Sequence, residues 1–194
     1  MFAQRFFLSA EQREIFTIVY WVWVLSEVAR HRWSRKEKVR AQADRGSLVL
    51  IYISLFLGLG LAFAIAATRA GLLPRAFFSV GITMMLLGVA LRQWAISLLG
   101  RHFAVTVRVL ANHHLVQSGP YRYIRHPAYA GSLLTLVGLG VVLRSWLAAL
   151  AILLIFTAAY SYRIRVEEAL LAQELGEEYV AYRRRTKRLI PWLW

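Results

Sequence analysis

Residues 113–131, HHLVQSGPYRYIRHPAYAG, concentrate the side chains that could bind an anionic ligand. The segment holds three histidines, two arginines and three tyrosines, in a chain that is 59% hydrophobic. Because proline disfavours helix at the preceding residue and suits the first helical turn, a helix is expected to begin at Pro127, directly after His126. A helix start presents free N–H groups and a positive dipole end, so the pattern predicts an anion site beside Arg125. A basic, aromatic loop that contacts lipid headgroups remains the structural alternative.

Arg163 and Glu167 form the second candidate group. They are four residues apart, so they share one face of the expected helix. Acidic residues are scarce, and none occurs between Asp44 and Glu167, which leaves no carboxylate pair of the kind that glycosidases use. A surface ion pair is the structural alternative. The functional hypothesis is that both side chains face a cavity, where arginine holds a ligand anion and glutamate accepts from hydroxyl or amino groups.

The histidines could instead bind a metal ion or haem. A metal site usually shows histidines four residues apart on a helix or a carboxylate partner, and neither pattern accompanies His113, His114 or His126. The chain also contains no cysteine. The sequence therefore predicts no metal site.

Long apolar runs must position these residues. A membrane span needs about 20 apolar residues, and five segments are expected to cross: 15–29, 47–68, 76–100, 128–143 and 146–162. The last two belong to one apolar stretch, which as a single helix would be about 52 Å long. We therefore expect a helical hairpin with its turn at Arg144 and Ser145, followed by a cytoplasmic amphipathic helix. The predicted fold is an all-α integral membrane protein, with residues 1–194 forming a single domain.

Basic residues predict the orientation of the spans. The expected loops on one side and the C-terminal tail hold eighteen lysines and arginines, against five on the other side. Since these residues accumulate in cytoplasmic loops, the N-terminus is expected outside or in a lumen, and residues 113–131 and 163–192 in the cytoplasm. The basic residues flank membrane spans instead of forming a soluble basic domain, so the expected partner is the lipid bilayer and not nucleic acid. The sequence does not indicate an oligomeric state.

Several ordered motifs resemble one known family. His-Leu-Val, Gly-x-Tyr and Arg-His-Pro-x-Tyr are followed, after two short spans, by R-x-x-x-E-E and GEEYVAYRRRTKRLIPW. In this order they are similar to the isoprenylcysteine carboxyl methyltransferase family, which is related in pattern to the membrane phospholipid N-methyltransferases. The resemblance covers roughly residues 90–194.

The resemblance implies S-adenosylmethionine as the cofactor, with S-adenosylhomocysteine as its product. It implies that Arg163 binds the substrate and that Glu167 binds the cofactor, both as catalytic residues. No convincing counterpart of a further polar cofactor contact occurs near Thr106. The remaining cofactor-binding residues that it implies are His113, His114, Leu115, Val116, Tyr121, His126, Pro127, Ala128 and Tyr129.

The residues favour a carboxylate as the methyl acceptor. A carboxylate is ionised at neutral pH and needs no general base, and an arginine can hold it through two parallel hydrogen bonds. An amine must first lose a proton, which Arg163 cannot accept. The leading hypothesis is therefore methylation of a lipid-like carboxylate, which the family implies is a C-terminal S-isoprenylcysteine. Phospholipid N-methylation is the alternative, and a membrane scaffold, transporter or haem or metal carrier is the non-enzymatic one.

Overall fold

The computed structural model describes residues 9–33, 39–42, 44–100, 108–110 and 115–190. Helices occupy all five segments in which spans are expected, and a sixth follows the break at Gly176, where φ is +55°. The helices are α1 (Ala10–Trp33), α2 (Ser47–Ala67), α3 (Phe77–Leu99), α4 (Pro127–Val142), α5 (Trp146–Leu175) and α6 (Glu177–Arg185), with a short 3-10 helix, η3, at Gly119–Arg122.

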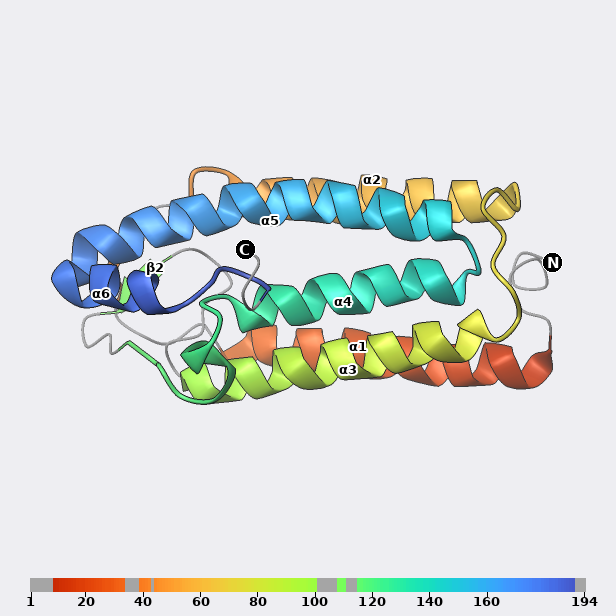
Figure 1. The fold of residues 1–194 in the computed structure, drawn as a ribbon, viewed down its shortest axis with the longest axis horizontal. Helices are drawn as coiled ribbons and strands as arrows, with labels where there is room; N and C mark the ends of the chain where they lie inside the picture. Colours follow the sequence, from red (N-terminus) through yellow and green to blue (C-terminus); the bar gives the residue numbers. More distant parts are fainter. Residues whose placement is uncertain (1–8, 34–38, 43, 101–107, 111–114, 191–194) are drawn as a thin grey trace.

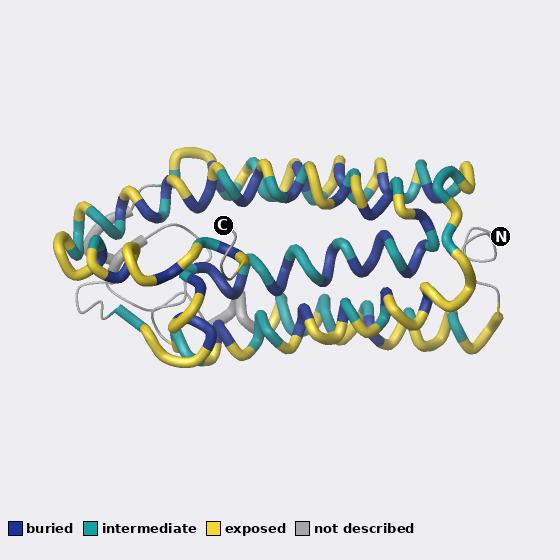
Figure 2. The backbone as a smooth tube through the Cα atoms, viewed as in Figure 1, coloured by how far each residue is buried: buried dark blue, intermediate teal, exposed yellow. Residues whose placement is uncertain are grey.

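The five long helices run along one axis of an elongated bundle (Figure 1). Helix α4 lies between two pairs, with α2 beside α5 on one side and α1 beside α3 on the other. It is accordingly the most enclosed of the five, and Figure 2 shows buried and half-buried residues along its whole length. The helix that begins with Pro127 is thus held from two sides.

Glycines allow α3 and α4 to approach closely. A Cβ atom added at Gly88 would lie 2.4 Å from Thr135 Oγ1 and 2.5 Å from its backbone nitrogen. A Cβ at Gly131 would lie 2.7 Å from the backbone nitrogen of Arg92. Contacts this short exclude any side chain, and small residues at helix crossings are typical of membrane bundles.

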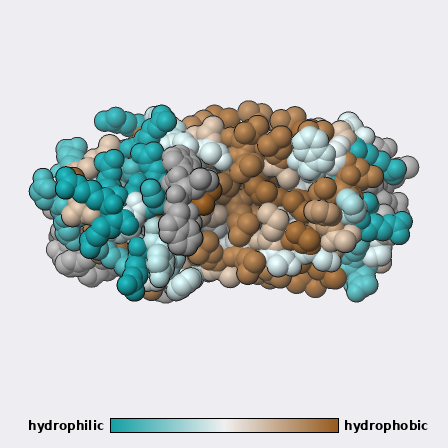
Figure 3. Space-filling view, viewed as in Figure 1, coloured by the Kyte–Doolittle hydropathy of each residue, from teal (hydrophilic) through white to brown (hydrophobic). Residues whose placement is uncertain are grey.

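Three helices, α2, α3 and α5, are long and apolar enough to cross a membrane. Helix α4 is apolar but has only 16 residues. The structure therefore supports three of the five predicted spans. At 1.5 Å per residue the 30 residues of α5 exceed the hydrocarbon thickness of about 30 Å, so its C-terminal turns project beyond the membrane. Figure 3 shows the corresponding hydrophobic band between two hydrophilic ends.

The predicted hairpin turn at Arg144 and Ser145 is present. Arg144 adopts a left-handed conformation with φ of +57°, and its guanidinium donates to the carbonyl of Leu73 at 2.9 and 3.1 Å. The Ser145 hydroxyl accepts from the backbone of Ala148 at 3.1 Å, which caps α5. The single charge in the apolar stretch therefore fixes the turn.

The expectation of an all-α fold is confirmed for the bundle, and the connections add one small sheet that was not predicted. Two short strands, β1 (Val39–Gln42) and β2 (Arg108–Leu110), pair antiparallel, with Ala41 opposite Val109 and Gln42 opposite Arg108. They lie in the polar connections after α1 and after α3, and with four and three residues they are too short for hydrophobic periodicity to predict them. The sheet joins these two connections at the end of the bundle where α4 begins.

Candidate active site

The candidate site lies where α4 begins and α5 leaves the hydrophobic band. Helix α4 starts at Pro127, and His126 precedes it with φ of −125° and ψ of 56°, as the sequence predicts. The same end of the bundle holds the start of α2 and the C-terminal half of α5. Residues from the two motifs, 34 to 68 positions apart, therefore meet.

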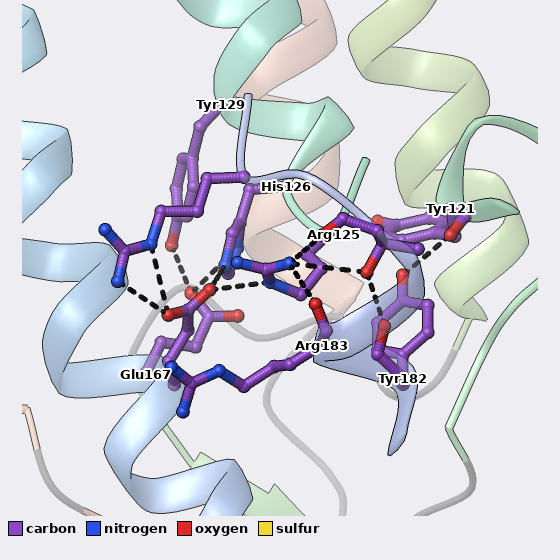
Figure 4. Close-up of polar contacts among 10 residues, drawn as sticks. Tyr121, Arg125, His126, Tyr129, Glu167, Tyr182 and Arg183 are labelled. Atoms are coloured by element: carbon purple, nitrogen blue, oxygen red, sulfur yellow. Dashed lines mark hydrogen bonds and ion pairs between the residues drawn. The ribbon is translucent and has the colours of Figure 1, made fainter. Parts of the chain in front are cut away.

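A hydroxyl links Arg163 to Glu167. Arg163 Nε donates to the Tyr129 hydroxyl at 2.8 Å, and that hydroxyl donates to Glu167 Oε2 at 2.8 Å. Figure 4 shows Tyr129 and Glu167 among these polar contacts. Hydrogen bonds to charged groups are stronger than those between neutral groups. The Arg163–Tyr129–Glu167 relay therefore holds two successive turns of α5 against the first turn of α4.

Aromatic stacking holds the Tyr129 ring between two neighbours. The His126 ring stacks on one side with centroids 5.6 Å apart, and the Tyr160 ring on the other at 5.2 Å. His126 Nδ1 also lies 4.0 Å from Glu167 Oε2. The side chain of Glu167 remains 31% exposed, so a ligand can reach it.

A second set of polar groups meets Arg163 from α2. Arg163 Nη1 donates to the Ser47 hydroxyl at 3.0 Å and lies 3.4 Å from Asp44 Oδ1. Arg163 is buried, with 4% of its surface exposed. Arg163 and Glu167, which were predicted to share one helix face, are linked indirectly through the Tyr129 hydroxyl, and the guanidinium also bonds to Ser47 at the start of α2.

Glu168, which the sequence analysis did not single out, is a buried carboxylate that contacts basic side chains from two other segments. Its Oε1 accepts from Arg125 Nε at 2.8 Å and lies 3.4 Å from His126 Nε2, and its Oε2 accepts from Arg188 at 3.2 and 3.3 Å. Burial alone would raise the pKa of this carboxyl, but the hydrogen bonds from His126 and Arg125 and their charges outweigh burial and lower its pKa to about 2. Glu168 therefore stays ionised at neutral pH.

The segment after α6 closes over the start of α4. The backbone nitrogens of Arg125 and His126 donate to the carbonyls of Lys187 and Arg188 at 2.7 and 3.0 Å, and Lys187 donates back to Tyr123 at 3.1 Å. The Arg125 guanidinium adds bonds to the carbonyls of Thr186 and of Arg183 (Figure 4). The backbone of the loop before α4 is thus fixed by residues 62 to 64 positions further along the chain.

Tyr182 makes a further link to this loop. Its hydroxyl donates to the carbonyl of Tyr121 at 2.7 Å, and burial raises the pKa of Tyr182, so the hydroxyl stays protonated. Tyr121 itself is buried in an apolar cluster with Ala128 at the start of α4 and with Ala95 and Ile96 near the end of α3. Val116 packs against the same cluster.

An ion pair ties α1 to this end of the bundle. Arg92 on α3 donates to both carboxylate oxygens of Glu27 on α1, at 2.7 Å for Oε2, and also to the carbonyl of Ala128 at 3.2 Å. The two charges inside predicted spans are therefore paired with each other, as charges at membrane depth usually are.

The predicted site residues divide into three groups. His126, Tyr129, Arg163 and Glu167 meet in the polar cluster. Val116, Tyr121 and Ala128 meet in the adjacent apolar cluster. Pro127 is buried at the start of α4, and Leu115 is half-buried in the connection before η3, whereas His113, His114 and the Thr106 region lie outside the described residues.

A groove in the described part of the structure lies away from this site. This apolar groove, of about 530 Å³, lies at the opposite end of α2 and α5 and is lined by residues such as Ile65 and Leu150. Among the described residues, no group of three or more histidine, aspartate and glutamate side chains gathers as a metal site would require.

These features define a helical membrane protein with a buried polar cluster at one end of its bundle. Residues 81–173 match the model of the isoprenylcysteine carboxyl methyltransferase family, which confirms the family resemblance that the motifs indicate. The matched residues include the whole of the motif region 113–131 and the start of the motif region 163–192.

Individual relatives agree with the family match. The chain is 36% identical over 115 residues to protein-S-isoprenylcysteine O-methyltransferase B of Arabidopsis thaliana, covering 58% of each protein. It is 35% identical over 107 residues to the protein-S-isoprenylcysteine O-methyltransferase of Schizosaccharomyces pombe, covering 54% of this chain and 45% of that one. It is also 36% identical over 114 residues to the cobalt-zinc-cadmium resistance protein CzcN of Cupriavidus metallidurans, covering 57% and 49%.

A solved structure extends the similarity to three dimensions. The eukaryotic intramembrane Ras methyltransferase ICMT superposes with a TM-score of 0.58 at 26% identity, over 76% of this chain and 51% of that one. This chain spans about half the length of that protein, 58% of the length of the Arabidopsis relative and 45% of the length of the Schizosaccharomyces relative.

Proposed function

We propose that this protein is an S-adenosylmethionine-dependent methyltransferase that methylates the carboxylate of a lipid-like acceptor, in particular a C-terminal S-isoprenylcysteine. The observation that carries the proposal is the Arg163–Tyr129–Glu167 relay. It joins the residue that suits an anionic acceptor to the residue that suits the cofactor, within one polar cluster beside the hydrophobic band.

The residues at the site fit the chemistry of the cofactor. S-adenosylmethionine carries a carboxylate, an ammonium group, ribose hydroxyls and an adenine ring, and when bound it would supply an activated methyl group. The partly exposed Glu167 carboxylate suits the ammonium or hydroxyl groups, and the helix start at Pro127 suits the carboxylate. The apolar cluster around Tyr121 and Ala128 suits the ring.

Arg163 would orient the acceptor. Its guanidinium is buried against α2 and α4 and always charged, so it can hold a carboxylate by charge-assisted hydrogen bonds. Because a carboxylate needs no deprotonation, the protein has to provide position and exclusion of water more than proton transfer. A prenyl chain could stay in the bilayer while the carboxylate reaches Arg163, since Arg163 lies on a helix that crosses the hydrophobic band.

We further propose that the polar end of the bundle faces the cytoplasm and the N-terminus the opposite side. The loops at that end carry most of the basic residues. The cofactor would then arrive from the cytosol and the acceptor from the membrane.

Methyl transfer from labelled S-adenosylmethionine tests the proposal. The reconstituted protein is offered farnesylated cysteine, its carboxamide and phosphatidylethanolamine in separate reactions. We expect label on the free carboxylate only, and base should release it because methyl esters hydrolyse. Base-stable label on phosphatidylethanolamine would instead identify a phospholipid N-methyltransferase, and folded protein that labels none of the three would contradict an enzymatic function.

A further inference from the structure

Arg163 is approached by two carboxylates that come from different elements. Glu167 reaches it through the Tyr129 hydroxyl, from α5 itself. Asp44 reaches it from the segment before α2, with Oδ1 at 3.4 Å from Nη1. The proposed function uses Glu167 but gives no role to Asp44.

The position of Asp44 is fixed by the start of α2. Its Oδ2 accepts from the backbone nitrogen of Leu48 at 3.2 Å, and its Oδ1 accepts from the Ser47 hydroxyl at 3.1 Å. The same hydroxyl accepts from Arg163 at 3.0 Å. Asp44 therefore accepts from a backbone N–H in the first turn of α2 and faces the guanidinium at the same time, and its side chain is 19% exposed.

We propose that Asp44 is the resident counter-ion of Arg163, with which the substrate carboxylate competes, and that this competition favours release of the methyl ester. The inference rests on the proposed function, because it takes Arg163 as the group that binds the acceptor. It makes Asp44 a residue that sets the preference of the site between acceptor and product.

The reason is the change of charge on the acceptor. A buried arginine without a partner is costly, so Asp44 keeps Arg163 paired before the acceptor binds. An anionic acceptor must then share the guanidinium with Asp44, and the two carboxylates repel each other. Methylation removes the acceptor's charge, after which Asp44 is the stronger partner and the neutral ester is held less tightly.

Binding to the Asp44→Asn variant tests this role. Asparagine keeps a side-chain oxygen that can cap α2 but removes the charge. Repulsion between two carboxylates on one guanidinium is strong at low dielectric and is reduced here by partial exposure, so we expect about tenfold tighter binding of an anionic acceptor. The probes are farnesylated cysteine and its methyl ester, titrated by calorimetry into the full chain saturated with S-adenosylhomocysteine, and the ester should change by less than about twofold.

Two further variants separate charge from geometry. Ser47→Ala removes the bridging hydroxyl but keeps the charge of Asp44, so carboxylate binding should not tighten. Glu11→Gln neutralises an exposed carboxylate in the first turn of α1, at the other end of the bundle, and should leave both affinities unchanged.

The results distinguish this inference from the proposed function. If Arg163→Gln binds the farnesylated carboxylate as well as the wild type does, the proposed function fails. If Arg163→Gln loses binding while Asp44→Asn leaves it unchanged or weakens it, the role of Asp44 alone fails. Equal tightening of carboxylate and ester in Asp44→Asn, or equal tightening in Ser47→Ala, would also overturn it.

Discussion

Replacing Tyr129 by phenylalanine removes one hydroxyl and leaves the ring between His126 and Tyr160. The hydroxyl accepts from Arg163 at 2.8 Å and donates to Glu167 at 2.8 Å. Each hydrogen bond to a charged group contributes about 1.5 to 3 kcal/mol. Because the two bonds share one atom they do not add fully, and we expect a loss of about 3 kcal/mol in transition-state stabilisation.

That loss corresponds to about a hundredfold fall in kcat/KM for methyl transfer to a farnesylated cysteine. The assay measures initial rates at varied acceptor and saturating cofactor, with the folded state checked by thermal unfolding. Tyr123→Phe is the matched control, since Tyr123 lies in the connection just before α4 and is 59% exposed, and its kcat/KM should stay within about twofold. A Tyr129→Phe enzyme that keeps kcat/KM within threefold of the wild type would refute the positioning role of the relay.

The other predictions concern stability, measured by thermal unfolding in detergent. Glu168→Gln should lower the unfolding temperature at neutral pH. Because the folded-state pKa of Glu168, about 2, lies below the ordinary value of 4.5, the wild type should lose stability as the pH falls from 4.5 to 2. An equally steep loss in the variant would contradict this assignment. Gly88→Ala should destabilise the fold by about 1 to 3 kcal/mol, because its side chain would clash with Thr135. Gly60→Ala, which has open space around it, should be neutral or stabilising. Similar effects at both sites would count against close packing of α3 on α4. Glu27→Gln should destabilise the fold by about 1 to 3 kcal/mol, because Arg92 would lose its charged partner. If the effects of Glu27→Gln and Arg92→Gln are additive in a double-mutant cycle, the two side chains do not stabilise the fold as a pair.

Local patterns predicted the helices and part of the site. The proline at position 127 marked the start of α4, and the length of the apolar stretch required the turn at Arg144 and Ser145. The spacing of Arg163 and Glu167 placed both on one face of α5, where both reach Tyr129. These predictions depended on interactions between residues close in sequence.

The remaining features depend on contacts between distant residues. Glu168 pairs with Arg125 and Arg188, and Asp44 meets Arg163 from another helix, so no spacing in the sequence marks either carboxylate. The two strands have only four and three residues, which is too short for hydrophobic alternation to reveal them within polar connections. The break at Gly176 separates α5 from α6, so the amphipathic helix that was expected after the hairpin is divided between the two.

The central claim is that the start of α4 and the C-terminal half of α5 form one site, with cofactor and acceptor held by different residues. Calorimetric titration of S-adenosylhomocysteine into the wild type, Glu167→Gln and Arg163→Gln tests it most directly. The account predicts saturable binding to the wild type, about tenfold or greater weakening in Glu167→Gln, and affinity within about threefold of the wild type in Arg163→Gln. Absence of binding to folded wild-type protein, or weakening in Arg163→Gln with none in Glu167→Gln, would contradict it.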